Sequence, residues 1–189
     1  MTTVKRKRRR KIIIPVRAPD VLGGVELPPI IATDLRSIIG RTYWVLLSDI
    51  TGDIMHQFIK CKLKIIGVNE SYAYTKYAGH EYFREYIRSL FIRGTSYVEA
   101  ISDITVKEGY KYRVYAAVFT PKRITNSRKK AIRREIFKVY EKWNKKEDYI
   151  FTRDIIHGII DSEIVKSVKK IYPIRWASIF KVKLVSKIT

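Results

Sequence analysis

Alternation of apolar and polar side chains predicts most of the strands in this chain. Over residues 57–68, Ile59, Cys61, Leu63 and Ile65 occupy every second position, and lysines fill positions between them. This period of two is that of a β-strand with one buried face. Similar apolar or alternating runs predict further strands at 43–48, 72–77, 96–106, 110–120 and 175–185. Short turns join several of these runs, so we expect antiparallel hairpins.

An apolar period of 3.6 residues predicts helices between and after the strands. It occurs at 80–92, 127–146, 149–158 and 161–171. Asp161 or Ser162 is expected to cap the last of these helices, and Pro173 follows its end. In the long helix at 127–146, the stripe expected to face the core is Ile132, Ile136, Val139, Tyr140 and Trp143.

The remaining segments set the domain boundaries. Residues 17–40 are rich in Pro and Gly and show no period, so we expect an extended loop held by contacts. Residues 1–11 are expected to be a disordered basic arm. We therefore predict an α+β fold in which residues 12–189 form a single domain. Its core would be an antiparallel β-barrel of about six or seven strands with interleaved and C-terminal helices, and the last strand, 175–185, would return to the sheet.

The charge of the chain is far from balanced. Its 189 residues include 39 Lys and Arg against 18 Asp and Glu, a formal net charge of +21. Residues 1–11 hold seven basic side chains and no acid, and residues 122–146 hold eleven basic side chains and two acids. One basic run alone is usually a solvated face. Two dense clusters in so short a chain indicate contact with a polyanion, above all nucleic acid.

Other features of the composition narrow the class of protein. Cys61 is the single cysteine, which excludes a disulfide framework within the chain and is typical of a reducing, intracellular compartment. No run of about 18 apolar residues occurs, so no membrane span is predicted. The apolar run after the basic start is cut by Pro15 and Arg17, too early for the core of a signal peptide.

One segment, GHEYFREYIRSL at 79–90, resembles the start of the zinc-protease motif His-Glu-x-x-His. Arg84 stands where the second His is needed, and its charge repels a metal ion. His56 and His157 fall on other predicted elements, and His80 is expected near a helix start, as a cap. Signatures of serine nucleophiles and phosphate loops are also absent. We therefore predict no enzymatic activity, no cofactor and no metal.

Basic side chains on the predicted surface are the candidate binding groups. Arg84 and Arg88 lie four residues apart on one helix face, where guanidinium groups suit phosphate oxygens. Local ion pairs with Glu81 and Glu85 are the alternative. Tyrosines interleave with basic residues, as at 110–113, and would either stack on bases or pack in the core. The predicted RNA-binding residues are Lys5, Arg6, Lys7, Arg8, Arg9, Arg10, Lys11, Arg84, Arg88, Arg93, Lys122, Arg123, Arg128, Lys129, Lys130, Arg133 and Arg134.

Several short segments occur in a fixed order over about 17–185. They are Ile39-Gly40-Arg41, Asp49-Ile-Thr-Gly-Asp53, Gly79-His80-Glu81 with Arg84-Glu85-Tyr86-Ile87-Arg88-Ser89-Leu90, Lys107-Glu-Gly109-Tyr110 with Arg113-Val114, Ala131-Ile132-Arg133, and Ile171-Tyr172-Pro173 with Lys181-Val182-Lys183. This ordered set resembles the archaeal and eukaryotic small-subunit ribosomal protein family S-three-A-e, also called the eukaryotic-type S-one protein. Glu85 and Glu108 stand where that family usually has Asp, and the chain ends soon after its last predicted strand, as archaeal members do.

The resemblance implies a β-barrel with helices that forms a structural, non-catalytic part of the small ribosomal subunit. It implies binding of ribosomal RNA on the platform near the mRNA exit, and a cytoplasmic location on the ribosome. The implied partners are small-subunit ribosomal RNA, neighbouring small-subunit ribosomal proteins and mRNA near the exit. One alternative is a DNA- or RNA-binding module outside the ribosome. Another is an enzyme acting on nucleic acid, which would need His80 and Asp49 or Asp53 around one cleft.

Overall fold

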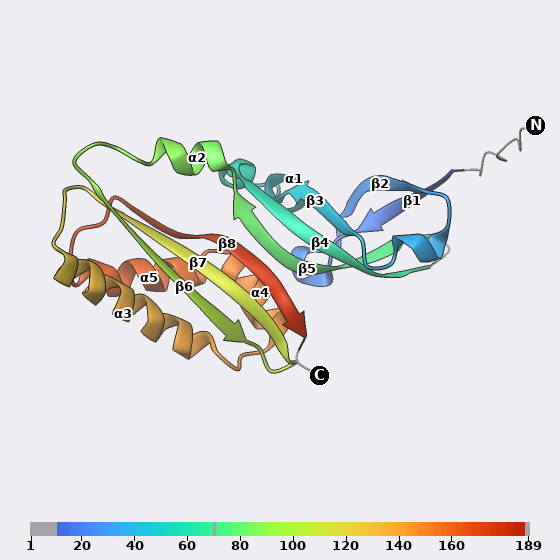
Figure 1. The fold of residues 1–189 in the computed structure, drawn as a ribbon. Helices are drawn as coiled ribbons and strands as arrows, with labels where there is room; N and C mark the ends of the chain where they lie inside the picture. The colour runs from blue at the N-terminus through green and yellow to red at the C-terminus, as the bar shows by residue number, and fades with distance from the viewer. Residues whose placement is uncertain (1–10, 70, 188–189) are drawn as a thin grey trace, which may run out of the picture.

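The computed structural model describes residues 11–69 and 71–187 (Figure 1). In these residues the strands are β1 (Ile12–Arg17), β2 (Glu26–Ala32), β3 (Thr42–Leu46), β4 (Ile59–Val68), β5 (Ala73–Tyr82), β6 (Ser96–Thr105), β7 (Tyr110–Thr120) and β8 (Trp176–Lys187). The α-helices are α1 (Leu47–Thr51), α2 (Arg84–Ser89), α3 (Asn126–Trp143), α4 (Asp148–Ile156) and α5 (Ile159–Lys169). Short 3-10 helices are η1 (Asp20–Leu22), η2 (Leu35–Ile38) and η3 (Ile54–Phe58). Among these, no helix combines the length and the apolar content needed to cross a membrane.

The strands form one sheet that stays open, so the α+β class is confirmed and the predicted closed barrel is wrong. The strands pair in the order β3, β4, β5, β8, β7, β6. At the start of β5, β1 also pairs with it, and β2 pairs with β1. In the described strands β3 and β6 do not pair with each other. The apolar face of β6–β8 is covered by α3 and α5 instead, so the sheet buries this face without curling onto itself.

Helices α3, α4 and α5 lie together on one side of β6–β8, and the main core fills the space between them (Figure 1). The alternation read from the sequence is confirmed on β4 and β7. Ile59, Cys61, Leu63 and Ile65 are all buried on β4, and so is the predicted stripe of α3. On β7 the buried positions are Tyr112, Val114, Ala116 and Val118.

The segment 17–40 is more ordered than its composition predicts. It contains β2, which pairs antiparallel with β1 from Ile12 opposite Ala32 to Arg17 opposite Glu26. Pro28 and Pro29 misled the expectation of a loop, because proline cannot donate to a ladder of hydrogen bonds. β2 pairs only with β1 among the described strands, and such an edge strand tolerates prolines on its free side.

The predicted helix at 80–92 is largely wrong. β5 continues through Tyr82, and α2 comprises only Arg84–Ser89. Residues Gly79, His80 and Glu81 pair with Lys183, Val182 and Lys181 of β8, which is about a hundred residues away in sequence. The helical spacing of the aromatic residues has another cause. Tyr82 and Tyr86 stack on each other, and both contact the ring of Trp176.

The C-terminal helices follow the predicted order, but their ends differ. α5 begins at Ile159, so the expectation that Asp161 or Ser162 precedes it as a cap is wrong. The Asp161 carboxylate instead accepts hydrogen bonds from the Ser178 hydroxyl and from the backbone N–H of Ile179, at 2.9 Å. Burial raises the pKa of Asp161, although both of these hydrogen bonds oppose the shift. Asp161 therefore fixes α5 against β8.

Candidate nucleic-acid interface

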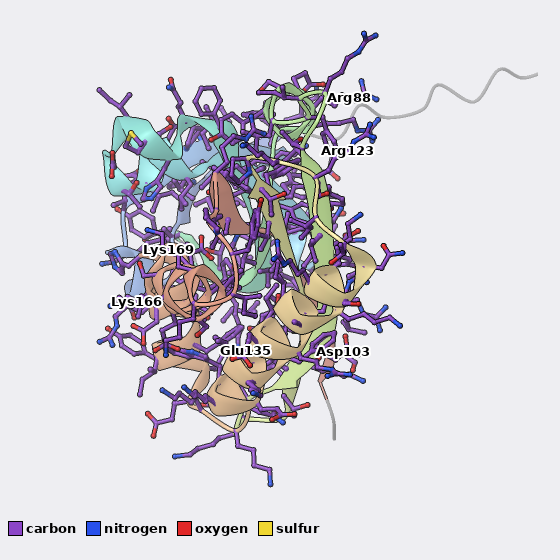
Figure 2. All side chains as sticks on the ribbon, turned by 90° about the vertical axis from the view of Figure 1, so that its left-hand side faces the viewer. Arg88, Asp103, Arg123, Glu135, Lys166 and Lys169 are labelled. Atoms are coloured by element: carbon purple, nitrogen blue, oxygen red, sulfur yellow. The ribbon has the colours of Figure 1, made fainter. Side chains whose placement is uncertain are left out.

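Two groups of predicted RNA-binding residues lie at one end of the sheet. Arg88 on α2 and Arg123, between β7 and α3, are both at this end in Figure 2. The loop after α2 is held there because the ring of Phe91 packs edge-on against Phe119, with 4.9 Å between centroids. The backbone N–H of Ile124 also donates to the Ser96 hydroxyl at 3.1 Å. These contacts bring together a basic end formed by Arg88, Arg93, Lys122 and Arg123, all of which are exposed.

No carboxylate of the described residues forms an ion pair with the four cations of the basic end. Glu81, the alternative partner of Arg84, instead accepts from Lys60 at 3.0 Å and from Lys181 at 2.9 Å. Within the described residues, no ion pair joins Arg84 or Arg88 to a carboxylate. Partial burial on its own would raise the pKa of Glu81, but the hydrogen bonds from Lys181 and Lys60 lower it overall.

Helix α3 carries the second predicted group along its exposed sides. Lys129, Lys130 and Arg134 make no ion pair with a described residue, while two other cations have contacts inside the protein. The guanidinium of Arg128 lies over the ring of Tyr172, 5.3 Å from its centroid. Arg133 Nε donates to the carbonyl oxygen of Glu99 at 2.9 Å. These two residues therefore contribute to packing as well as to the charge of the surface.

The other predicted residues cannot be placed as fully. Lys11 is exposed immediately before β1, whereas Lys5, Arg6, Lys7, Arg8, Arg9 and Arg10 lie outside the described residues. The expected arm is therefore represented only by its last residue, and the structure does not connect it with the basic end.

The tyrosines of β5 and β7 are used mainly inside the fold. Tyr112 is buried, and its hydroxyl donates to Asp148 Oδ1 at 2.7 Å. Burial, reinforced by the nearby Asp148 carboxylate, raises the pKa of Tyr112. The ammonium group of Lys76 lies 3.2 Å from the ring centroid of Tyr110. Tyr112 therefore cannot stack on a base, and of its two predicted roles it has the second, packing in the core.

His80 is a buried structural residue of β5, so the prediction that it caps a helix is wrong. The Tyr77 hydroxyl donates to Nδ1 at 2.6 Å, and Nε2–H donates to the carbonyl oxygen of Ile179 at 3.3 Å in the tautomer that satisfies both contacts. Burial lowers the pKa of His80 to about 4, although the bond to Ile179 opposes the shift. The side chain is therefore neutral at pH 7.

The three histidines lie closer together than the sequence indicates. His56, His80 and His157 border one small cavity of about 90 Å³ together with Asp161. Asp49 and Asp53, which the nucleic-acid enzyme alternative requires beside His80, do not line it. In the described part of the chain, no three His, Cys, Asp or Glu side chains are grouped to hold a metal ion. This cavity gives no support to the enzyme alternative.

Sequence reasoning missed a second basic surface on the sheet itself. Lys60, Lys62 and Lys64 project from β4 and Lys181 and Lys183 from β8, and all but Lys60 line one cleft. The alternation in each strand indicated that its lysines share a face. Nothing local indicated that β8 pairs with β5, which brings the two lysine rows to the same place.

Comparison with known proteins gives a consistent result. The chain matches the sequence model of the Ribosomal S3Ae family over residues 2–188. A protein of Methanopyrus kandleri named small ribosomal subunit protein eS1 is 36% identical over 189 residues, covering 97% of this chain and 90% of that protein. Proteins of the same name from Desulfurococcus amylolyticus and Saccharolobus islandicus are 37% and 36% identical, covering 96% of this chain and 85% and 88% of their own length.

Proposed function

The chain belongs to the Ribosomal S3Ae family, and on that premise we propose that it is a structural constituent of the small ribosomal subunit that binds ribosomal RNA. The match along nearly the whole chain to proteins named small ribosomal subunit protein eS1 carries this proposal. The protein acts without catalysis, as a component of cytoplasmic ribosomes.

Ribosomal RNA is bound chiefly through its phosphates. The contacting groups are the basic end with Arg84, five cations of α3 (Arg128, Lys129, Lys130, Arg133 and Arg134), and the arm from Lys5 to Lys11. Phosphate contacts provide affinity and orientation without reading sequence, so specificity comes from the shape of the folded RNA. The open sheet holds α2 and the start of α3 at one end, which fixes the relative position of these cations.

The location within the subunit is the finer part of the proposal. The protein lies on the platform near the mRNA exit, beside other small-subunit proteins and close to the path of mRNA. The support for this location is the family resemblance, which extends over nearly the whole chain.

The direct test is sedimentation of the tagged protein in a sucrose gradient of cell extract. We expect almost all of it to migrate with the small subunit and with complete ribosomes. A pool that migrates as free protein, or with DNA, would instead favour a nucleic-acid-binding module outside the ribosome. A binding assay with small-subunit RNA gives a second test. If the protein contacts six to ten phosphates, its affinity for the RNA should fall by roughly 10³–10⁵-fold when the salt concentration rises from 50 to 200 mM.

A further inference from the structure

A cleft of about 780 Å³ lies on the sheet, and no helix contributes to its lining among the described residues. Its lining residues belong to β3, β4, β5, β7 and β8, with the exception of Gly40, which lies two residues before β3. Lys62 of β4 and Lys183 of β8 are both in register with Gly79 of β5. These two lysines therefore belong to the strands on either side of β5, and both line the cleft.

The positive charge of this cleft is mostly unneutralised. Glu81 is shared by Lys60 and Lys181, so a single carboxylate serves two cations. Lys76 is paired with Asp148, at 2.7 Å. Lys62, Lys64 and Lys183 form no ion pair with any described residue. Cations gathered in this way repel one another, and a bound polyanion removes that cost.

The lining also has apolar surface, which a simple anion would not require. Trp44 pairs with Lys62 across β3 and β4, and the residue is 46% exposed. The ammonium groups of Lys60 and Lys62 lie 5.3 and 5.4 Å from its ring centroid. Ile66 and Val185 add exposed apolar atoms at the edge. Proteins that bind single-stranded nucleic acids combine basic groups with exposed aromatic rings in this way.

The dimensions favour a single strand over a duplex. Alternate side chains of a strand are about 6.5–7 Å apart, so Lys62 and Lys64 can contact charges repeated along one extended backbone. A volume of about 780 Å³ is within the range of pockets that enclose small ligands, and an RNA double helix is too wide to enter it.

We propose that this cleft binds a single-stranded segment of RNA, with phosphates on Lys62, Lys64 and Lys183 and a base or ribose against Trp44. The inference rests on the proposed function and adds to it a binding site separate from the basic end and α3. Unpaired ribosomal RNA at a junction is the kind of segment that fits.

The test compares two triple variants that each remove three positive charges. The cleft variant is Lys62→Gln/Lys64→Gln/Lys183→Gln. Its matched control is Lys166→Gln/Lys169→Gln/Lys170→Gln on and just after α5, where Lys166 and Lys169 lie away from Arg88 and Arg123 (Figure 2). Fluorescence anisotropy at 50 mM salt would measure the binding of labelled decauridylate and of a labelled RNA hairpin with a fully paired stem.

We expect the cleft variant to bind decauridylate roughly 10–100-fold more weakly than the wild type, with a salt slope reduced by about 2 for three lost contacts. The control should change by less than about threefold, and the paired stem should bind both variants alike. Equal binding of decauridylate by the two variants overturns the inference. A second outcome also overturns it: the three lysines are needed for binding of decaglutamate but not for binding of decauridylate. The occupant of the cleft would then be an acidic protein segment.

A footprint on the wild-type protein avoids any effect of substitution on folding. Lysine acetylation with and without decauridylate should show protection of Lys62, Lys64 and Lys183, while Lys166 reacts equally in both samples. Absence of that protection also contradicts the inference. The proposed function fails in a different way, because the wild-type protein would then not sediment with the small subunit.

Discussion

Replacing Gly79 with alanine should break the junction on which the open sheet depends. Gly79 has φ +132°, a conformation that side chains other than glycine rarely adopt. A Cβ atom there would overlap the carbonyl oxygen of Val182 and lie 2.9 Å from its carbonyl carbon. Both atoms belong to the backbone of β8, so no side-chain movement can relieve the overlap.

The magnitude follows from two contributions. A residue held in such a backbone region costs about 1–3 kcal/mol. Moving β8 away from β5 weakens the pairing of Gly79, His80 and Glu81 with β8, where each lost hydrogen bond is worth about 0.5–1.5 kcal/mol. We expect Gly79→Ala to lower the free energy of unfolding by about 3–5 kcal/mol, which corresponds to a melting temperature roughly 6–20 °C lower for a chain of this size.

The assay is urea unfolding followed by circular dichroism, with Gly94→Ala as the control. Gly94 has φ +84°, but a Cβ there would have no atom within 4 Å, so that variant reports backbone strain alone. We expect it to lose about 1–2 kcal/mol. If the two variants lose the same free energy, the overlap with Val182 is relieved in some other way and the reasoning is refuted.

Three further outcomes are expected. Since folding lowers the pKa of His80 from 6.5 to about 4, the unfolded state binds one more proton in that interval. The free energy of unfolding should therefore fall by up to about 3 kcal/mol as the pH drops from 6.5 to 4. The fall should be smaller in His80→Gln, and urea titrations at several pH values would measure both. Ile136→Ala, in the core under α3, should cost about 2–5 kcal/mol by the same method, whereas a loss below 1 kcal/mol would mean that the site is not packed. Arg128→Ala/Lys129→Ala/Arg133→Ala should weaken assembly into small subunits in gradient profiles. Its unfolding free energy should fall by no more than about 2 kcal/mol, and a larger loss would assign these residues to the fold.

Local patterns predicted those parts of the fold that depend on local information. The alternation at 57–68 and 110–120 correctly identified buried faces, because a strand with one solvated side requires it. The periodic stripe of α3 is buried for the equivalent reason in a helix. Between Gly79 and Tyr82 the local period was misleading, since pairing with β8 outweighed it.

In the candidate interface, too, the sequence indicated the features that depend on local residues and missed the one that depends on strand pairing. Basic runs in the sequence pointed to α3 and to the arm, because charge density is visible without any structure. The lysine cleft depends on which strands are neighbours, and neighbours so distant in sequence cannot be deduced from composition. The closed barrel was wrong for a related reason, because helices that cover a sheet remove the need for closure.

The position of β8 also affects how the protein is made. β8 is the last strand of the chain, yet it lies between β5 and β7 in the middle of the sheet, and its contacts reach back 99 residues, from Ile179 to His80. During synthesis the hairpins on either side can form early, but they cannot join until Trp176–Lys187 has been translated. Until then the edges of β5 and β7 that receive β8 are unpaired and open to aggregation. A nascent chain interrupted shortly before β8 would therefore have nearly all of its residues and lack the centre of its sheet.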